Sequence, residues 1–432
     1  MNSQMKVAVI GSGIAGLAAA HALRWNASVT LFEADERFGG HANTVDLTLD
    51  GVTHPVDTGF LVFNERTYPG LIRLFAELEV PTVKSDMSFS VQVPGAAGGR
   101  PLEWSGTDLQ SVFCQRSNLV RPRFWRMLRD LLRFNALATR LVLAERDDTQ
   151  QPLDAFLREH GFGDELRDWY LLPMVGCIWS SPANEVLHFP VGTLLRFCHN
   201  HGLLQVANRP QWFTVEGGSR RYVDKVIAGL RRARLGTPVH RVLREPGRVL
   251  VQTDAGTEVF DRIVVATHPD QALRLLADAS EQERSVLGAI RFQRNRAVLH
   301  TDASVLPRNP RAWAAWNYES AGNGSGDVCV HYLINKLQPL PWKRPVIVSL
   351  NPLRPIDKRS IDREFDYAHP ILDGAAVCAQ VELKSLQGLH NTWFCGAWTG
   401  YGFHEDGLAS GEAAAKSLLV RSRIQVATEA SL

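Results

Sequence analysis

The feature that most constrains this chain is a glycine-rich turn that follows a short apolar segment near its start. Residues 6–10 predict a buried strand, residues 11–16 (Gly-Ser-Gly-Ile-Ala-Gly) a turn, and the apolar residues up to Leu23 a helix. In such a pattern the first glycine permits the tight turn, the second lets a pyrophosphate approach the backbone, and the third lets the helix pack on the strand. The N–H groups at the helix start then face the phosphates.

Two further features support a dinucleotide site. Residues 28–32 predict a second strand, and Glu33 follows it, where a carboxylate is placed to accept hydrogen bonds from an adenosine ribose. Gly39 and Gly40 lie just beyond, and residues without side chains suit a backbone that lies against a second bulky part of the cofactor. The N-terminal part of the chain therefore predicts a dinucleotide-binding domain.

The C-terminal part carries matching signals. Residues 392–396 predict a strand, residues 407–419 a helix of small residues, and residues 398–404 an aromatic and glycine loop between them. The start of that helix is suited to point its dipole at a ring with negative charge, as reduced flavin has near N1 and O2.

Together these segments resemble the FAD-dependent amine oxidase and phytoene desaturase superfamily, which implies FAD as the cofactor. Four internal segments, residues 57–60, 213–220, 237–242 and 263–269, share the resemblance. It implies an α/β fold, in which a Rossmann-type FAD-binding domain of the glutathione reductase 2 and amine oxidase type accompanies a mixed α+β substrate domain.

Three blocks, residues 173–181, 351–353 and 402–407, resemble a bacterial subgroup of FAD proteins associated with modified fatty acids. One branch of that subgroup desaturates methylated acyl chains on the way to furan fatty acids. The chain departs from many relatives at Gly396-Ala397, where they have an acid after the glycine. Contacts to the cofactor there are expected from the backbone or from other groups.

The motifs and the resemblance together predict a set of cofactor-contacting residues. These are Gly11, Gly13, Ile14, Ala15, Gly16, Glu33, Ala34, Arg37, Gly39, Gly40, His41, Gly59, Val239, Ala266, Gly396, Glu405, Asp406 and Leu408. For Glu405 and Asp406 we favour helix capping or backbone contact over side-chain catalysis, because acids are common at helix starts. His41 is expected either at the flavin or as a loop histidine satisfied locally. Asp57 is expected to hydrogen-bond backbone in the turn that Gly59 makes.

No side-chain base or metal cluster is identified, and flavin oxidation of a carbon substrate needs little acid–base machinery. The candidates for a catalytic role are His404, Tyr401 and Trp398, of which the two aromatic residues are suited to wall a flat ring. Alternation in residues 330–336 places His331, Leu333 and Asn335 on one face of a strand and Tyr332 and Ile334 on the other. One of these faces is expected to line a cavity, and we place Asn335 and Lys336 at the exposed strand end.

The FAD-binding domain is predicted to comprise residues 1–66, 206–285 and 390–422. The substrate domain is predicted to comprise residues 67–205, mostly helical, and residues 286–389, which form a sheet that floors the substrate cavity. Helices are expected at 68–78, 122–143, 152–160 and 191–201, and strands near Phe89, near Gln92, and at 297–301, 328–334 and 346–350. Residues 423–432 are expected to form a flexible tail.

Residues 116–140 hold seven arginines and one acid, Asp130, with aromatic and leucine residues at mostly helical spacing. Such a helix either lies on an anionic membrane or buries its apolar stripe in the domain and leaves the arginines in solvent. We favour the second reading from the sequence alone.

Composition excludes several classes of protein. The net charge is +2, so no global basic drive toward nucleic acid exists, and six scattered cysteines without zinc-ligand spacing argue against a disulfide framework or a zinc site. No signal peptide and no apolar run near the ~20 residues of a membrane span are visible. We expect a cytoplasmic protein, at the inner membrane face if residues 116–140 bind lipid.

The subgroup resemblance implies, and the scarcity of candidate acids and the arginine-rich stretch favour, an FAD-dependent oxidoreductase that dehydrogenates an apolar lipid. The expected reaction is C–C desaturation of a methylated or unsaturated fatty acyl chain. Three alternatives stay open. They are an amine oxidase acting on a C–N bond, a redox-neutral fatty-acid isomerase, and a flavin-bearing membrane-accessory protein without turnover.

Overall fold

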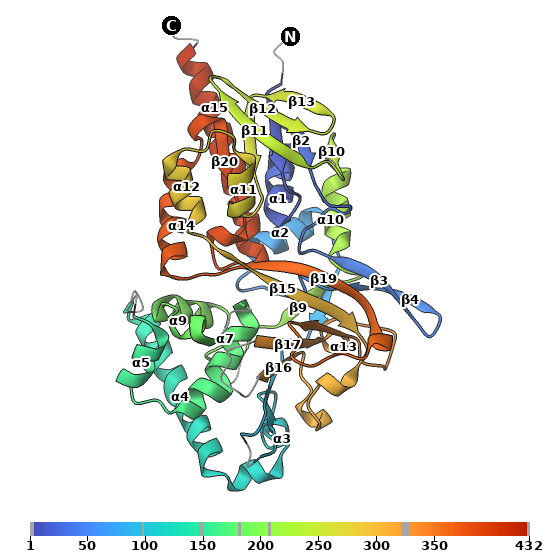
Figure 1. Cartoon of the computed structure of the whole chain (residues 1–432), viewed down its shortest axis with the longest axis vertical. Coiled ribbons are helices and arrows are strands. Elements are labelled where there is room, and N and C mark those ends of the chain that lie inside the picture. Colours follow the sequence, from blue (N-terminus) through green and yellow to red (C-terminus); the bar gives the residue numbers. More distant parts are fainter. Residues whose placement is uncertain are drawn as a thin grey trace.

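The computed structural model describes residues 4–96, 99–146, 151–179, 183–205, 209–320 and 328–429. Its upper part, which holds both termini (Figure 1), is built on a five-stranded sheet of order β10-β2-β1-β14-β20. These strands span Ala233–Arg234, Ser28–Phe32, Lys6–Ile10, Arg262–Val265 and Thr392–Phe394, and every neighbouring pair is parallel. The predicted α/β fold of Rossmann type is confirmed, and it is assembled from distant segments of the chain.

Alternation along β1 explains how this sheet is covered. Val7 and Val9 pack in the core formed with α1 (Ile14–Leu23), α10 (Arg220–Ala228) and α15 (His404–Glu429). Ala8 and Ile10 pack on the opposite side. That side is covered by α11 (Pro269–Leu275), α12 (Glu281–Gly288), α14 (Gly374–Leu386) and the antiparallel strands β11 (Val239–Glu245), β12 (Arg248–Thr253) and β13 (Gly256–Phe260). Both faces are buried, as a parallel sheet requires.

The lower part is organised by a seven-stranded sheet of order β19-β15-β18-β17-β16-β7-β8. The strands span Ile361–Pro370, Phe292–His300, Ile347–Leu350, Val328–Leu333, Trp316–Ser320, Phe89–Val93 and Leu102–Ser105. All neighbours are antiparallel except β16 and β7. In Figure 1 the long strands β15 and β19 cross the middle of the molecule, between the two parts.

Helices cover one face of this sheet, where α7 (Leu172–Trp179) packs on β16 and β17. The four helices predicted from the sequence are confirmed as α2 (Pro69–Glu77), α4 (Pro122–Leu143), α5 (Leu153–Glu159) and α9 (Val191–Asn200). The shorter helices are α3 (Leu109–Val112), α6 (Asp164–Leu166), α8 (Ala183–Leu187) and α13 (Ile334–Leu337), with a 3-10 turn η1 at Arg116–Val120. The remaining strands are β3 (Thr44–Leu49) with β4 (Val52–Asp57), and β5 (Phe63–Asn64), β9 (Trp212–Val215) and β6 (Thr82–Ser85).

Four expectations need correction. The two strand candidates near Phe89 and Gln92 are one strand, β7, and the strand expected to reach residue 334 ends at Leu333, where α13 begins. α15 begins at His404, earlier than the expected 407, because Asp406 accepts the N–H of Phe403 at 2.9 Å and so stabilises an earlier turn. The same helix continues to Glu429, beyond its expected end at residue 419, since alanine, arginine and glutamine favour helix, and the flexibility expected for residues 423–432 stays a prediction. Among the described residues, no helix has both the length and the apolar character needed to cross a bilayer.

Candidate functional site

The turn between β1 and α1 has the geometry of a phosphate site. Gly13 is the N-cap of α1, no side chain caps the helix, and a Cβ at Gly13 would meet nothing within 4 Å. The N–H groups of Ile14, Ala15 and Gly16 have no acceptor among the described residues. This helix end therefore leaves N–H donors and open space for an anion.

The other two glycines serve packing. Gly11 has φ of +97°, and a Cβ there would lie 2.8 Å from the carbonyl oxygen of Ala266, whose N–H bonds Ile10 at the end of β1. A Cβ at Gly16 would lie 1.9 Å from the carbonyl oxygen of Gly11. Ala266 thus packs against the turn, and larger residues at either glycine would separate the turn from the helix.

Glu33 lies beside the same turn. Its Oε2 accepts the N–H of Ser12 at 2.9 Å as well as the Ser12 hydroxyl, and its Oε1 accepts the N–H of Asp35 at 3.0 Å. A carboxylate has about four acceptor positions, so capacity remains for ribose hydroxyls. The N–H of Thr237 bonds the Glu33 carbonyl at 2.7 Å, which brings the start of β11, with buried Val239, beside the end of β2. Ala34 is exposed next to it.

The glycine pair faces the first turn. The N–H of Gly39 bonds the carbonyl of Ser12 at 3.1 Å, and a Cβ at Gly40, where φ is +58°, would lie 3.1 Å from the Cα of Gly13. The guanidinium of Arg37 contacts the carbonyl of Ala42 at 3.4 Å and so stays near this loop. The two glycine segments predicted from the sequence therefore lie together, with only small groups between them.

His41 follows the pair and enters the junction between the two parts of the molecule. Gly59 holds it there, because a Cβ at Gly59 would lie 2.2 Å from the His41 carbonyl oxygen, to which Phe60 donates at 2.7 Å. The His41 ring stacks on Tyr367 of β19 with centroids 4.9 Å apart and lies 5.2 Å from His369. Its Nε2 is buried without a hydrogen-bond partner among the described residues.

The β19 side chains at the junction are held by hydrogen bonds. The hydroxyl of Tyr367 accepts from Asn43 Nδ2 at 2.8 Å and contacts the Thr58 hydroxyl at 2.8 Å. His369 Nδ1 lies 3.0 Å from the side-chain amide of Asn295, whose oxygen accepts from Asn351 at 2.7 Å. Hydrogen bonds from within the protein therefore fix the positions of these side chains.

These junction histidines are neutral near pH 7. Burial lowers the pKa of His41 well below its usual value, and it lowers the pKa of His369 to about 4. For His369, the electrostatic interaction with His268 lowers the pKa further, in the same direction as burial. The largest contributions to either shift come from burial and from neighbouring histidines, and no carboxylate is among them.

The three candidates for a catalytic role are separated by the fold. His404 is buried in the FAD-binding part, where it stacks on Phe60 at 3.8 Å and contacts the Tyr222 hydroxyl at 3.0 Å, and burial lowers its pKa to about 3. Trp398 is 2% exposed and packs in the core below the five-stranded sheet, with its N–H donated to Thr267. Both side chains are held by packing and hydrogen bonds inside the protein. Tyr401 lies instead against the helical layer, with its ring 5.7 Å from Phe197.

The acids at the start of α15 cap helices. Glu405 accepts the N–H groups of Gly70 at 2.7 Å and Leu71 at 2.9 Å, so it caps α2 rather than its own helix. Asp406 caps α15, and burial raises its pKa to about 6. The favoured capping of the C-terminal helix is observed for Asp406, whereas Glu405 caps a different helix, a contact that sequence spacing does not show.

Two other residues predicted to contact the cofactor sit in packed surroundings. The side chain of Leu408 is buried in the FAD-binding core, where a Cβ on Gly70 would touch it at 2.7 Å. Gly396 donates its N–H to the Ser410 hydroxyl at 3.0 Å, and a Cβ there would lie 2.1 Å from the Trp398 indole nitrogen. Only their backbone is available to a cofactor.

Asp57 has a structural role, but its partners differ from the expected ones. Its carboxylate accepts from Ser219 N at 3.0 Å, from the Ser219 and Thr44 hydroxyls, and from Gln338 Nε2 at 2.7 Å, rather than from the turn at Gly59. These groups come from distant segments, which spacing along β4 does not reveal. Burial raises the pKa of Asp57 to about 6 although each hydrogen bond acts in the opposite direction.

The two faces of β17 differ as alternation predicts. Val330 and Tyr332 pack with Cys177 and Trp169 of the helical layer, whereas His331 faces a polar network on the other side of the sheet. There His331 Nε2 lies 3.1 Å from Glu319 and 3.3 Å from Cys329. Asn335 and Lys336 lie on α13 rather than at a strand end, with Asn335 bonded to residues 342–346 and Lys336 paired with Asp86 at 3.3 Å.

Glu319, Cys329 and His331 form a trio with ligand-like spacing that the cysteine pattern in the sequence did not predict. Arg354 contacts the other Glu319 oxygen at 2.7 Å, so a protein cation already neutralises this carboxylate. Hydrogen bonds within the protein therefore explain why these three side chains lie together.

Sequence reasoning also missed Tyr367, His369, Asn295 and His268 at the junction. A signal existed, since Phe365, Tyr367 and His369 alternate along one face of β19. The sequence does not show which side chains pack against that face.

Four features of the described residues fit FAD. They are the uncapped N–H donors with open space at Gly13, the fixed acid Glu33, the glycine backbone at residues 39–40, and the buried Nε2 of His41, which has no hydrogen-bond partner among those residues. Gly11, Gly13, Glu33 and Gly40 would hold its adenosine and phosphate parts, and His41 and the start of α15 would lie toward its ring.

The fold is shared with solved structures of flavin enzymes. Cyclohexylamine oxidase from Brevibacterium oxydans IH-35A matches with a TM-score of 0.70 and 17% identity over 97% of this chain and 100% of that one. A CLA-producing fatty acid isomerase from P. acnes matches with a TM-score of 0.67 and 15% identity over 96% of this chain and 98% of that one. Putrescine oxidase bound to putrescine matches with a TM-score of 0.66 and 15% identity over 96% and 99%.

Residues 14–297 match the family described as flavin containing amine oxidoreductase. That span is more than half of the chain; it begins at the first residue of α1, directly after the phosphate turn, and includes Glu33 and the glycine pair. The chain belongs to this family, and it is an FAD-dependent oxidoreductase.

Proposed function

We propose that this oxidoreductase dehydrogenates an apolar lipid at a C–C bond, with a methylated or unsaturated fatty acyl chain as its substrate. The observation that carries the proposal is the neutral junction wall formed by His41, Tyr367 and His369. No carboxylate is among the main causes of the lowered pKa of His41 or His369, so these rings have no anionic neighbour of the kind that would hold a protonated amine. A hydrocarbon chain needs no such partner.

Aromatic side chains beyond the junction support the same substrate class. Phe89, Trp316 and Tyr332 of the sheet and Tyr170 of the helical layer retain accessible surface within one apolar cluster. Burial nevertheless raises the pKa of Tyr170 to about 12. Deep side chains that keep accessible surface are what the wall of an acyl-binding space would show, and their flat faces would order a chain with few hydrogen bonds.

When bound, FAD supplies the hydride acceptor, so the protein needs only to orient the C–H bond and exclude water. Gly40 and Gly59 fix the backbone of His41, and the Tyr367 hydroxyl is fixed by Asn43 and Thr58. The neutral rings place no charge beside an apolar chain. The proton that the substrate loses together with the hydride would pass to the Nε2 of neutral His41, unpartnered among the described residues, or to solvent.

The amine oxidase alternative has one residue in its favour. Glu185 on α8 has a buried Oε2 without a hydrogen-bond partner among the described residues. An ammonium group would supply that partner.

The test is anaerobic mixing of the FAD-loaded protein with an unsaturated or methylated acyl phospholipid, or with cyclohexylamine or putrescine, followed by flavin absorbance. We expect bleaching by the lipid, with a new double bond by mass spectrometry. Bleaching by amines alone would replace the proposal with the amine oxidase, and a rearranged lipid without net bleaching would replace it with the isomerase. A flavin that responds to neither class would favour the accessory role.

A further inference from the structure

Helix α4 has an apolar stripe on the side that faces away from the core. Its inner side is apolar as expected, with Phe124, Met127 and Phe134 fully buried. On the outer side, Trp125, Leu132 and Leu143 are 49%, 57% and 72% exposed. These positions are separated by whole turns at ~3.6 residues per turn, so they form one line along the helix. The outer side of a surface helix is ordinarily polar.

The stripe continues beyond the N-terminus of the helix. Leu119 and Val120 of η1 are 49% and 84% exposed, and Leu109 of α3 is 77% exposed. Six of the thirteen large apolar residues that are exposed in the described part of the chain therefore lie between positions 109 and 143. In Figure 1 α3 and the start of α4 form the end of the molecule that is farthest from the two termini. We call these residues and the arginines beside them the α4 surface.

The arginines make the outside of α4 mainly positive, and the exposed acids that flank it along the chain are Asp108 before α3 and Glu145 after α4. Arg126 and Arg129 have side chains that are 53% and 67% exposed. The carboxylates that they contact are buried: Glu165 is shared by Arg123 and Arg126, and Asp130 by Arg129 and Arg133. Since each buried acid serves two arginines, the outside keeps a net positive charge beside the apolar stripe.

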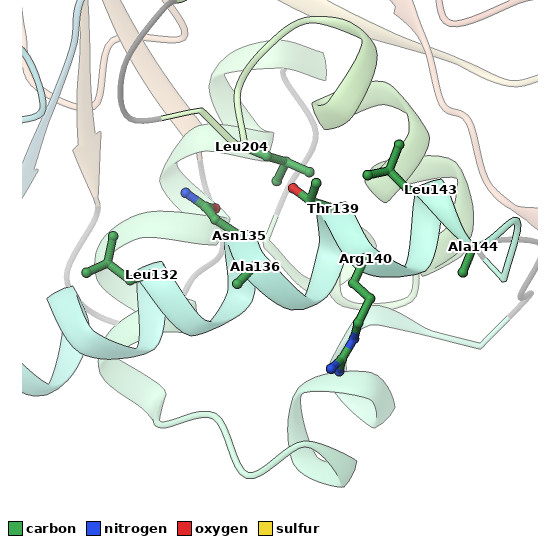
Figure 2. Close-up of a pocket in the computed structure, with 8 residues that line it drawn as sticks. All are labelled: Leu132, Asn135, Ala136, Thr139, Arg140, Leu143, Ala144 and Leu204. Carbon is green, nitrogen blue, oxygen red and sulfur yellow. The ribbon is translucent and has the colours of Figure 1, made fainter.

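The second half of the stripe borders an open groove of about 660 Å³. Figure 2 shows Leu132, Ala136, Arg140 and Leu143 along α4, with Leu204 on the segment behind it. Apart from Asn135, Thr139 and Arg140, its lining is apolar. The groove places a guanidinium at the edge of a hydrocarbon surface.

We propose that the α4 surface docks on an anionic lipid bilayer. Trp125, Leu132 and Leu143 enter the boundary between headgroups and acyl chains, while the arginines contact lipid phosphates. Charge complementarity selects this occupant, because a nucleic acid would leave the apolar stripe in water. A second copy of the chain would bring arginines against arginines. The inference does not rest on the lipid substrate, since docking is measured without turnover.

The test is sedimentation of the FAD-loaded protein with vesicles of phosphatidylcholine and phosphatidylglycerol, compared with phosphatidylcholine alone. We expect binding to the anionic vesicles that weakens as salt is raised. Arg116→Gln with Arg140→Gln, neither of which forms an ion pair with a described residue, is expected to weaken binding by about 25-fold, at ~1 kcal/mol per arginine. Trp125→Ser with Leu132→Ser and Leu143→Ser is expected to weaken it by about 100-fold or more.

The matched control removes exposed apolar residues elsewhere. Trp25→Ser, Val381→Ser and Val420→Ser, at positions 76%, 65% and 49% exposed, are expected to leave vesicle binding unchanged. FAD content and circular dichroism verify that each variant folds. The proposal is overturned if the wild-type protein stays in the supernatant, or if the α4 and control variants bind alike. It is also overturned if the wild type dimerises through the stripe and ignores vesicles.

Discussion

Two groups of buried histidines differ in charge. The junction histidines are neutral, whereas the group behind the seven-stranded sheet contains a protonated ring, His331. At the junction, burial lowers the pKa of His41 and His369, and both rings are neutral. Behind the seven-stranded sheet, His331 is just as buried, yet Cys329 and Glu319 raise its pKa to about 9 against the effect of burial. Burial alone therefore does not set the charge of an interior histidine, because Cys329 and the Glu319 carboxylate, both within hydrogen-bond distance, reverse the outcome.

The network behind the sheet shows the same rule within a few ångströms. His331 Nδ1 lies 2.6 Å from the Ser349 hydroxyl, which lies 2.7 Å from Nε2 of His300. Burial lowers the pKa of His300 to about 4, and the charge on His331 lowers it further. Protonated His331 then donates to Glu319 and Ser349, while neutral His300 accepts the N–H of Asp302 at Nδ1. Only the ring beside the acid carries the proton.

The largest expected effect comes from removing that acid. Glu319→Gln leaves His331 without its anionic partner in a buried site and is expected to reduce the free energy of unfolding by about 3 kcal/mol. Urea unfolding followed by circular dichroism measures the loss. Glu258→Gln removes a partly exposed partner of Arg234 and is expected to cost less than about 1 kcal/mol. Equal losses would mean that the His331 pair contributes no more than a surface pair.

The second prediction concerns pH. The pKa of His331 is raised above its unfolded value of 6.5, so its stabilisation is fully present below pH 6.5 and is lost as pH rises through about 9. The pKa of His369 is lowered to about 4, so its stabilisation is present above pH 6.5 and is lost as pH falls toward 4. Thermal unfolding is expected to show a smaller penalty for His331→Gln at pH 9.5 than at pH 6.5, by up to ~3 kcal/mol. A penalty independent of pH would contradict a charged His331.

A third variant introduces a carboxylate at the junction. Asn295→Asp places a carboxylate where the amide now lies 3.0 Å from His369 Nδ1. We expect the pKa of His369 to rise from about 4 to above 6.5, so that the flavin absorbance changes with pH between about 6 and 8. The stability cost is expected to be about 1–2 kcal/mol because a buried hydrogen bond is replaced. Wild-type absorbance, constant over that range, is the control.

The smallest effect is expected for a carboxylate that contacts backbone rather than histidine. Glu405→Gln weakens the bonds to Gly70 and Leu71 at the start of α2 and is expected to cost about 1 kcal/mol by urea unfolding. FAD content is expected to match that of the wild type, since the side chain is used by the protein. A variant that loses its FAD would show that Glu405 also serves the cofactor.

Regions differ in how well the sequence predicted them. Helix α4 was predicted at its observed bounds because Pro122 starts it and its inner side repeats with helical period. The phosphate turn was predicted because its function depends on backbone, and glycine spacing reports backbone directly. The capping by Glu405 and the partners of Asp57 were missed in detail because α2, Ser219 and Gln338 reach them only after folding.

The parallel FAD-binding sheet, the open helix start after the glycine turn and the acid after β2 could be predicted from the amino-acid sequence, because strand alternation and glycine spacing are local properties of the chain. The charges of the histidines, the core packing of Trp398 and His404 and the exposure of Trp125, Leu132 and Leu143 depended instead on how the chain packs in three dimensions. A pKa or an exposed surface is set by the surrounding side chains, whether they come from a distant segment, as Tyr222 does for His404, or from the adjacent strand, as Glu319 does for His331.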